Sequence, residues 1–265
     1  ILVLGSEEEN EGCMMPRERQ GAYIICFDPL DGSSNIDANV SVGSIWGIWK
    51  VKGSPSEVAR DPTKSLLNPG RELVSAGYAM YGSATNLVLT TGSGVACFVL
   101  DSTVGEFLLI NANMKCGTKR IYSVNEGNTA VWHPWFRAYI RSIKAARKPA
   151  ATKNGGAVVA GAPVKPPAPL YSARYIGAMV ADVHRTILYG GIFMYPDDQV
   201  STSGKLRLLY EAAPMAFLVE QAGGKATTGD GTRIMDIVPT TLHQRVPVFL
   251  GTSAEVDRVI AFNSR

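Results

Sequence analysis

The chain has 265 residues, of which 46% are hydrophobic and 18% charged, and its formal net charge at pH 7 is +3. This composition excludes an intrinsically disordered chain, and the length is enough for one large domain or two modest ones. Because no stretch approaches about 18 consecutive apolar residues, we expect a soluble protein without a membrane-spanning helix. The cysteines have no C-x-x-C spacing and predict reduced thiols in a cytoplasmic protein; they are Cys13, Cys26, Cys97 and Cys116.

The first part of the chain contains short β-rich runs bounded by Gly, Asp or Asn, which predict the strands of an extensive sheet. The expected strands cover residues 1–5, 21–27, 41–49, 73–82, 85–94, 95–101 and 105–112.

A low-complexity stretch rich in Ala, Pro, Gly and Lys at residues 145–169 predicts a flexible insertion. It belongs to a longer segment, residues 127–181, that contains eight Lys or Arg and no Asp or Glu. Such an excess can mark a nucleic-acid-binding surface, but much of it falls in the insertion. We therefore expect a solvated loop and no nucleic-acid partner.

Helices and strands alternate after the insertion, which predicts a layered α/β fold. Gly190 and Gly223 predict helix ends, Ser253 is expected to be the N-cap of the last helix, and Glu255 is expected in its first turn. The expected helices cover residues 176–191, 213–224 and 253–265, and the expected strands cover residues 191–196, 204–210 and 247–252.

Two carboxylates, Asp28 and Asp31, follow the apolar strand at residues 21–27. Pro29 favours a tight turn, which can bring both carboxylates and the Leu30 carbonyl around a hard divalent cation. The alternative is an Asp-Pro turn with an Asx or Ser cap. The backbone N–H groups of the next residues can cradle an anion; these residues are Gly32, Ser33, Ser34 and Asn35.

A second acidic loop, Glu7, Glu8 and Glu9, follows the first apolar run. Taken alone, it is typical of a solvated loop. Like charges at two strand ends repel unless a cation holds them, so the two loops together favour Mg²⁺ or Mn²⁺ and phosphate-ester chemistry.

Lys205 and Arg207 lie on one face of the strand expected at residues 204–210, with Glu211 at the start of the following helix. A Lys point charge and an Arg fork both bind phosphate oxygens, so the pattern predicts a phosphate site. The alternative is an edge strand with a polar outer face.

Polar residues near the expected second-half elements are further candidates for a second phosphate: Asn125, Arg174, Tyr175 and Tyr195. A buried tyrosine is more often a core residue with one hydrogen bond. The histidines are too widely spaced to predict a zinc site; they are His133, His184 and His243.

Four segments together resemble class I fructose-1,6-bisphosphatase: FDPLDGSSNID, NEG, ARYIGAMVADVHRTILYGGIFMYP and GKLRLLYEAAPMAFLVEQAGGKATTG. The resemblance runs from Ile1 to about Gly251 and is interrupted mainly by the insertion. It implies a layered sugar-phosphatase fold with mixed β-sheets sandwiched by helices and two subdomains. Residues 1–114 would be the remainder of an AMP-type allosteric domain carrying the metal-binding loops, and residues 115–265 a sugar-bisphosphate-binding domain.

The resemblance implies metal-dependent hydrolysis of the 1-phosphate of fructose 1,6-bisphosphate to fructose 6-phosphate and phosphate, a step of gluconeogenesis. It implies Mg²⁺ as the cofactor, with Mn²⁺ or Zn²⁺ as substitutes, and a homo-oligomer that is expected to be a tetramer. By the family pattern, Glu8 and Asp31 are the expected catalytic residues, with Glu8 near the attacking water. The expected metal ligands are Glu7, Asp28, the Leu30 carbonyl, Asp31 and Glu211.

The same pattern implies how the substrate is held. The 1-phosphate would lie on Gly32, Ser33 and Arg207, with Ser34 beside them; the sugar on Gly177, Met179 and Lys205; and the 6-phosphate on Asn125, Tyr175 and Tyr195. Arg174 would reach the 6-phosphate of a neighbouring subunit.

The chain also departs from the family pattern. Family members have residues before the position of Ile1, including helices that form much of the site for the inhibitor AMP and aspartates that help to activate the water, so the AMP site is expected to be largely missing. Ala22-Tyr23 stands where Lys-Tyr is frequent, and Asn128 where a second tyrosine is expected. The alternatives left open are a catalytically inactive fragment or sugar-phosphate-binding subunit, and a sedoheptulose-bisphosphatase.

Overall fold

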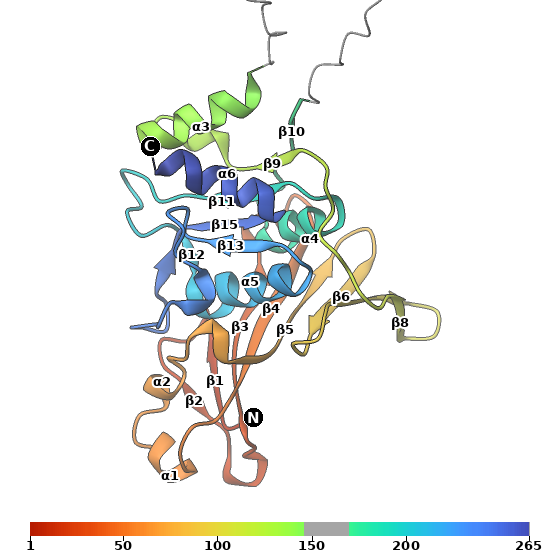
Figure 1. Cartoon of the computed structure of the whole chain (residues 1–265). Coiled ribbons are helices and arrows are strands. Elements are labelled where there is room, and N and C mark those ends of the chain that lie inside the picture. Colours follow the sequence, from red (N-terminus) through yellow and green to blue (C-terminus); the bar gives the residue numbers. More distant parts are fainter. Residues whose placement is uncertain (146–169, 265) are drawn as a thin grey trace, which may run out of the picture.

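The computed structural model describes residues 1–145 and 170–264 (Figure 1). Apart from Ala145, the predicted insertion at residues 145–169 lies outside the described residues. None of the helices in these two ranges has both the length and the apolar character needed to cross a membrane.

The first layer is an eight-stranded sheet with the strand order β2-β1-β3-β4-β5-β6-β7-β8. Neighbouring strands are antiparallel except β1 and β3, which pair in parallel. Each strand region predicted in the first part of the chain overlaps one of these strands, so that prediction is confirmed; the short β2 was not predicted. The strands are β1 (Val3–Ser6), β2 (Cys13–Met14), β3 (Tyr23–Asp31), β4 (Val42–Lys50), β5 (Leu73–Tyr81), β6 (Thr85–Thr90), β7 (Ala96–Asp101) and β8 (Glu106–Asn111).

The second sheet is mixed and has the order β10-β9-β11-β15-β13. Its strands are β9 (Ile121–Ser123), β10 (Ser172–Ala173), β11 (Ile192–Tyr195), β13 (Lys225–Thr227) and β15 (Val248–Gly251). A short antiparallel pair, β12 (Leu206–Arg207) and β14 (Arg245–Val246), stands apart from both sheets.

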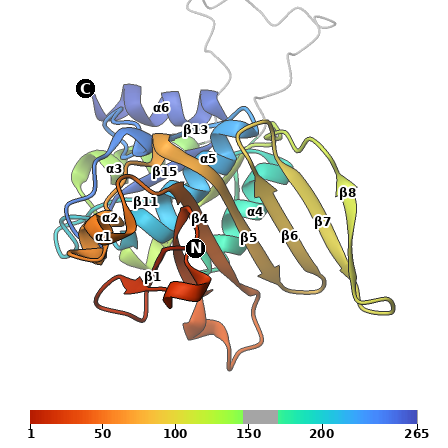
Figure 2. The same ribbon diagram turned by 90° about the horizontal axis from the view of Figure 1, so that it is seen from below.

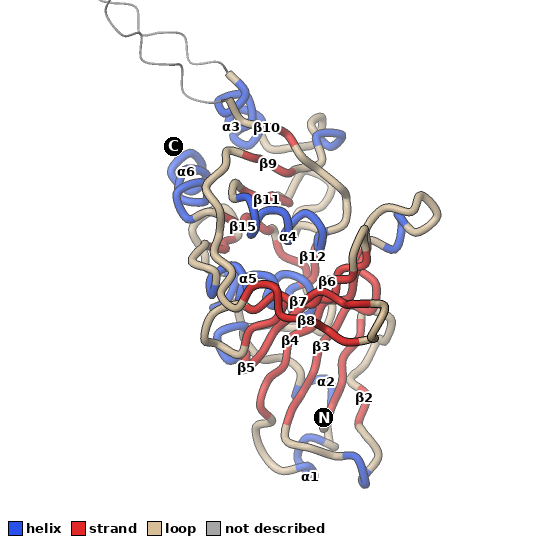
Figure 3. Tube along the Cα trace, turned by 90° about the vertical axis from the view of Figure 1, so that its right-hand side faces the viewer, coloured by secondary structure: helices blue, strands red, loops and turns tan. Residues whose placement is uncertain are grey.

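The helices complete a layered arrangement (Figure 2). Helices α4 (Met179–Tyr189) and α5 (Ala213–Gln221) lie between the two sheets, whereas α3 (Pro134–Lys144) and α6 (Ser253–Asn263) cover the other face of the second sheet. Figure 3 shows the same layers from the side. The short helices α1 (Pro55–Val58) and α2 (Pro62–Ser65) lie between β4 and β5 in the chain. The predicted α/β fold of mixed sheets and helices is confirmed.

Two apolar clusters hold these layers together. The larger lies between the sheets, where Val180, Val183 and Leu218 on the middle helices pack in one cluster with Ile45 and Tyr78 of the first sheet. The smaller lies beneath α3 and α6 and is rich in aromatic residues; its members include Trp132, Phe136, Tyr139 and Phe249. Each fully buried apolar side chain contributes about 1.5–3 kcal/mol. The larger cluster therefore fixes the middle helices against the first sheet, and the smaller fixes α3 and α6 against the second.

The structure corrects two details of the second half. The predicted strand at residues 204–210 ends at Arg207, and Leu208–Ala212 form a π-helix. Every residue of this helix is buried, so the alternation of buried and exposed positions expected for the strand stops there. Thr252, not Ser253, is the N-cap of α6. Ser253 is already helical, and its hydroxyl donates to the Gly223 carbonyl at 3.2 Å.

Two predicted helix ends are confirmed. Helix α4 stops at Tyr189 before Gly190, and α5 stops at Gln221 two residues before Gly223; both glycines have positive φ. At the next residue, Gly191, φ is +97°, and an added Cβ would lie 2.0 Å from the Ile121 carbonyl oxygen. Only glycine allows β11 to approach β9 this closely.

We expect Gly191→Ala to lower the free energy of unfolding by about 3 kcal/mol or more, because the backbone penalty and the steric overlap add. Gly223→Ala is the matched control: its φ is +85°, but an added Cβ meets nothing within 4 Å. The control should lose only about 1–2 kcal/mol. Urea denaturation of both variants measures the difference, and equal losses would contradict this account.

Candidate active site

A bulge in β3 places Asp28 and Asp31 on the same side of the first sheet. Asp28 pairs with Ile45 and Asp31 with Gly43, so the two residues between the aspartates face a single residue of β4. Residues three apart in a regular strand would point to opposite faces, and the extra residue of the bulge removes that difference. Asp28 is 2% exposed and Asp31 6%. The sequence predicted a turn after residue 27; the strand instead continues to Asp31 because the bulge accommodates Pro29, which has no N–H to donate.

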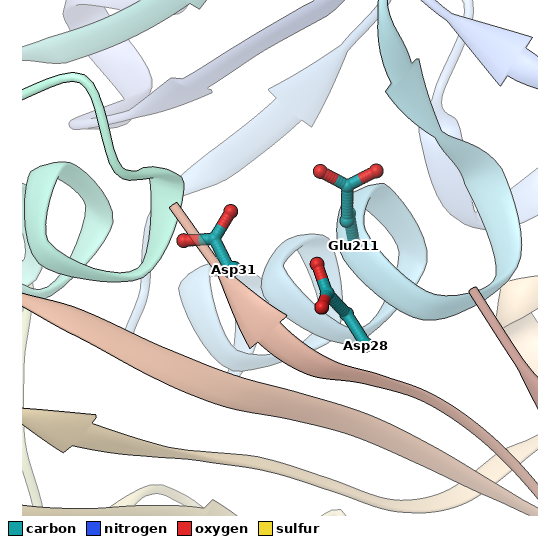
Figure 4. Close-up of side chains that lie close together, drawn as sticks. All are labelled: Asp28, Asp31 and Glu211. Carbon is teal, nitrogen blue, oxygen red and sulfur yellow. The ribbon is translucent and has the colours of Figure 1, made fainter. Parts of the chain in front are cut away.

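Glu211 faces the two aspartates of β3 from the π-helix that joins β12 to α5 (Figure 4). Its carboxylate is buried, 3% exposed, and accepts a hydrogen bond from the Arg207 backbone N–H at 2.6 Å. Asp28, Asp31 and Glu211 each offer a carboxylate oxygen, and these oxygens all lie within 4.8 Å of one another. π-Helical turns are rare in proteins, and those that do occur are often found at functional sites.

The electrostatics of this cluster are unfavourable without a cation. Burial, together with the neighbouring Glu7 charge, raises the pKa of Asp28 to about 8. Burial also raises the pKa of Asp31 to about 7, against the lowering effect of the hydrogen bond from the Val180 N–H, and it raises the pKa of Glu211 well above its ordinary value. Buried oxygen ligands that resist ionisation in the absence of a partner fit a hard divalent cation, which would compensate their charge.

Glu7 and Arg207 border the carboxylate cluster. Glu7 is half-buried, and its carboxylate lies 2.8 Å from Arg207 Nη2, while Arg207 Nη1 lies 3.9 Å from Glu211. Glu8 is exposed, and its backbone N–H donates to Ser6 Oγ at 3.3 Å. The structure therefore brings Glu7, Arg207 and Glu211 together and leaves the Glu8 side chain exposed.

The residues expected to hold the 1-phosphate lie where β3 meets the start of α4. Gly32 has a φ of +81°, and an added Cβ would lie 2.5 Å from Ala178 Cβ, so this position requires glycine. Ser33 and Ser34 follow in a short 3₁₀ turn and are exposed. Lys205 is exposed just before β12. The role of the Leu30 carbonyl stays a prediction; the Leu30 N–H donates to Asp28 Oδ1 at 2.8 Å.

A small pocket of about 70 Å³ adjoins Asp31. A second pocket, lined in part by Asn125 and Asn128, shares Tyr195 with it. Burial raises the pKa of Tyr175 to about 12, so this hydroxyl remains a hydrogen-bond donor at neutral pH. The residues that line the first pocket are Asp31, Tyr175, Gly177, Met179, Asp182, Phe193, Tyr195 and Leu206.

Arg174 is one predicted site residue that the structure does not bring to these pockets. Its side chain is exposed, and Nη1 donates to the neighbouring Ala173 carbonyl at 2.8 Å. Conversely, sequence analysis missed Asp182, which is fully buried on the first pocket's wall. The available signal was an aspartate three residues before Arg185 in an otherwise apolar helix pattern, a spacing that allows an ion pair within the helix.

We expect the free energy of unfolding of the metal-free protein to fall as pH rises from about 5 to about 8. The folded-state pKa values of Asp28 and Asp31 lie above the ordinary value, so the folded protein binds more protons than the unfolded chain in this window. That stabilisation is lost as pH rises through the folded-state pKa values. Because Mg²⁺ replaces the protons, it should stabilise the protein more at about pH 8 than at about pH 6.

Urea denaturation at a series of pH values measures this slope. Asp28→Asn should flatten it, whereas Glu11→Gln, which changes an exposed carboxylate, should leave it unchanged. A free energy of unfolding that stays level or rises with pH in the metal-free protein would show that the carboxylate cluster does not retain its protons.

Comparison with known proteins supports the predicted resemblance. Residues 1–112 match the family model described as the fructose-1,6-bisphosphatase N-terminal domain, and residues 116–264 match that of the C-terminal domain. Fructose-1,6-bisphosphatase of Saccharomyces cerevisiae is 49% identical over 98% of this chain and 69% of its own length, and fructose-1,6-bisphosphatase 1 of Bos taurus is 50% identical over 96% and 69%.

A solved structure agrees with the sequence relatives. The holo form of Leishmania major fructose-1,6-bisphosphatase superimposes with a TM-score of 0.87 at 50% identity, covering 100% of this chain and 77% of the other. The two family matches together cover nearly the whole sequence. The chain therefore belongs to the fructose-1,6-bisphosphatase family.

Proposed function

We propose that this chain hydrolyses the 1-phosphate of fructose 1,6-bisphosphate to fructose 6-phosphate and phosphate, a reaction of gluconeogenesis. The observation that carries the proposal is the cluster of three buried carboxylates beside a pocket lined by tyrosines. Such a cluster suits a divalent cation, and the family match supplies the substrate class. Mg²⁺ is the proposed ion, with Mn²⁺ or Zn²⁺ as substitutes.

The proposed metal ligands are Glu7, Asp28, the Leu30 carbonyl, Asp31 and Glu211. A divalent ion bound there would supply positive charge to the phosphate oxygens and would acidify the attacking water. The Arg207 guanidinium, fixed between Glu7 and Glu211, has further N–H groups that can donate to the phosphate. The backbone at Gly32, Ser33 and Ser34 can donate N–H groups to the same phosphate. Lys205 would place a second positive charge beside the sugar.

In the proposed step, the water oxygen forms a bond to phosphorus as the bond from phosphorus to the sugar O1 breaks. Glu8 accepts a proton of the attacking water, and the sugar O1 leaves as an alcohol after taking a proton from a second water molecule. Gly177 and Met179 line the sugar, while Asn125, Tyr175 and Tyr195 bind the 6-phosphate. The 70 Å³ pocket supports this division, because its lining joins Asp31 to Tyr175 and Tyr195.

Phosphate release from fructose 1,6-bisphosphate should require Mg²⁺ and should exceed release from inositol 1-phosphate and sedoheptulose 1,7-bisphosphate. Asp31→Asn should lower kcat by about 100-fold or more, because a ligand is lost. Glu8→Gln should lower kcat by about 100-fold by removing the base, whereas Glu9→Gln on the same loop should retain activity. Equal activity of the Asp31→Asn variant and the unaltered chain would refute the assignment.

We further propose a cytoplasmic homo-oligomer, expected to be a tetramer. The proposal of an oligomer is supported by the edge strand β8, where all six residues are exposed. The proposal of a cytoplasmic location is supported by the described cysteines, which are free thiols. An apolar edge strand with unpaired backbone groups favours association with another chain. Arg174 would then reach the 6-phosphate in a neighbouring subunit.

Ile110 and Val238 are each 58% exposed and give a matched pair for testing this interface. Ile110→Glu, on β8, should shift sedimentation toward smaller species, and Val238→Glu should not. If both variants sediment like the unaltered chain, β8 is not part of the interface.

A further inference from the structure

Asp182, on the first turn of α4, makes polar contacts that neither the carboxylate cluster nor the proposed phosphate groups explain. Its side chain is 0% exposed. Oδ1 accepts hydrogen bonds from Ser123 Oγ and Arg185 Nη2, each at 2.7 Å. The Ile176 N–H lies 3.1 Å from both carboxylate oxygens, and the Gly177 N–H donates to Oδ2 at 3.0 Å. Because every partner belongs to a fixed element or loop, moving this buried carboxylate would leave several groups unpaired.

The same helical turn also holds a member of the carboxylate cluster. The Val180 N–H, two residues before Asp182, donates to Asp31 Oδ2 at 2.7 Å. Asn35 Nδ2 donates to the Gly177 carbonyl at 3.2 Å, which ties the loop after β3 to the same backbone. The first turn of α4 is therefore bonded to Asp31 on one side and to the backbone of residues 176–177 on the other.

We propose that Asp182 is a positioning residue that fixes the segment carrying Tyr175 and Gly177 relative to Asp31, and thereby sets the affinity for the end of the substrate remote from the cleaved phosphate. This inference rests on the proposed function. Arg185 belongs to the same arrangement, because its Nη2 also donates to the Arg174 carbonyl at 3.0 Å. The separation between Asp31 and the backbone of residues 176–177 then depends on one buried side chain.

The test compares Asp182→Asn with Thr186→Val. The amide has nearly the same shape but must present N–H groups where the carboxylate accepts them. Thr186 is a matched control: it is buried one turn later on α4, and its hydroxyl donates to the Asp182 backbone carbonyl at 2.8 Å without contacting the 174–177 segment. Thr186→Val should lower stability without moving that segment.

Asp182→Asn should raise KM for fructose 1,6-bisphosphate about tenfold with kcat changed less than about threefold, because a displaced binding group weakens affinity. Hydrogen exchange at the Ile176 and Gly177 amides should accelerate about tenfold. Thr186→Val should change neither quantity. Unchanged KM and exchange in Asp182→Asn, or equal changes in both variants, would overturn the inference.

Ser123→Ala keeps the inference testable if Asp182→Asn does not fold. It removes one donor to Asp182 and should shift exchange and KM in the same direction by about two- to threefold; no shift would overturn the inference. Hydrogen exchange and fructose 6-phosphate binding by calorimetry need no turnover. If the unaltered chain hydrolyses nothing, the proposed function fails, and these two measurements still decide the role of Asp182.

Discussion

Mutual repulsion among three buried carboxylates is the constraint on which the rest of the structure depends. Their oxygens lie within 4.8 Å of one another, where little solvent reaches them. One backbone N–H per carboxylate offsets part of the cost; the donors are Leu30 for Asp28, Val180 for Asp31 and Arg207 for Glu211. These bonds orient the oxygens but do not offset the cost of ionising three neighbouring buried carboxyl groups, so their pKa values stay raised. A divalent cation would compensate that charge.

Irregular backbone brings these carboxylates together. A bulge turns Asp28 and Asp31 to one side of β3, and a π-helical turn directs Glu211 toward them. Regular strands and α-helices would separate the same residues, so the site exists only because both elements deviate. The regular elements around them, above all α4 between the two sheets, keep these deviations in place through close packing.

Sequence reasoning was most reliable where chemistry depends on local residue order. Asp28, Pro29 and Asp31 stand within four positions, so their proximity was predictable even though the bulge was not. The strand prediction was wrong beyond Arg207 because an apolar run fits a buried strand and a buried helix equally. The contact between Asp182 and Ser123 could not be predicted, because Ser123 lies 59 positions away in the chain and no local pattern encodes such a contact. The spacing to Arg185 was the one local signal for this residue.

Sequence analysis also missed helix α3, although the residues that predict it are local. Phe136, Tyr139, Ile140 and Ile143 are buried at helical spacing, and Pro134 occupies the first turn, so the signal was present in the sequence. The domain division at residue 114 and the roles of the individual site residues stay predictions. Comparison with the family supports the overall activity, whereas each residue's role requires its own experiment.

The most direct test of the account is a crystal structure of the protein soaked with Mn²⁺ and examined by anomalous scattering. The account predicts a Mn²⁺ peak in contact with the carboxylate oxygens of Asp28, Asp31 and Glu211. A fully occupied Mn²⁺ site elsewhere, with these three carboxylates still without a metal, would contradict it.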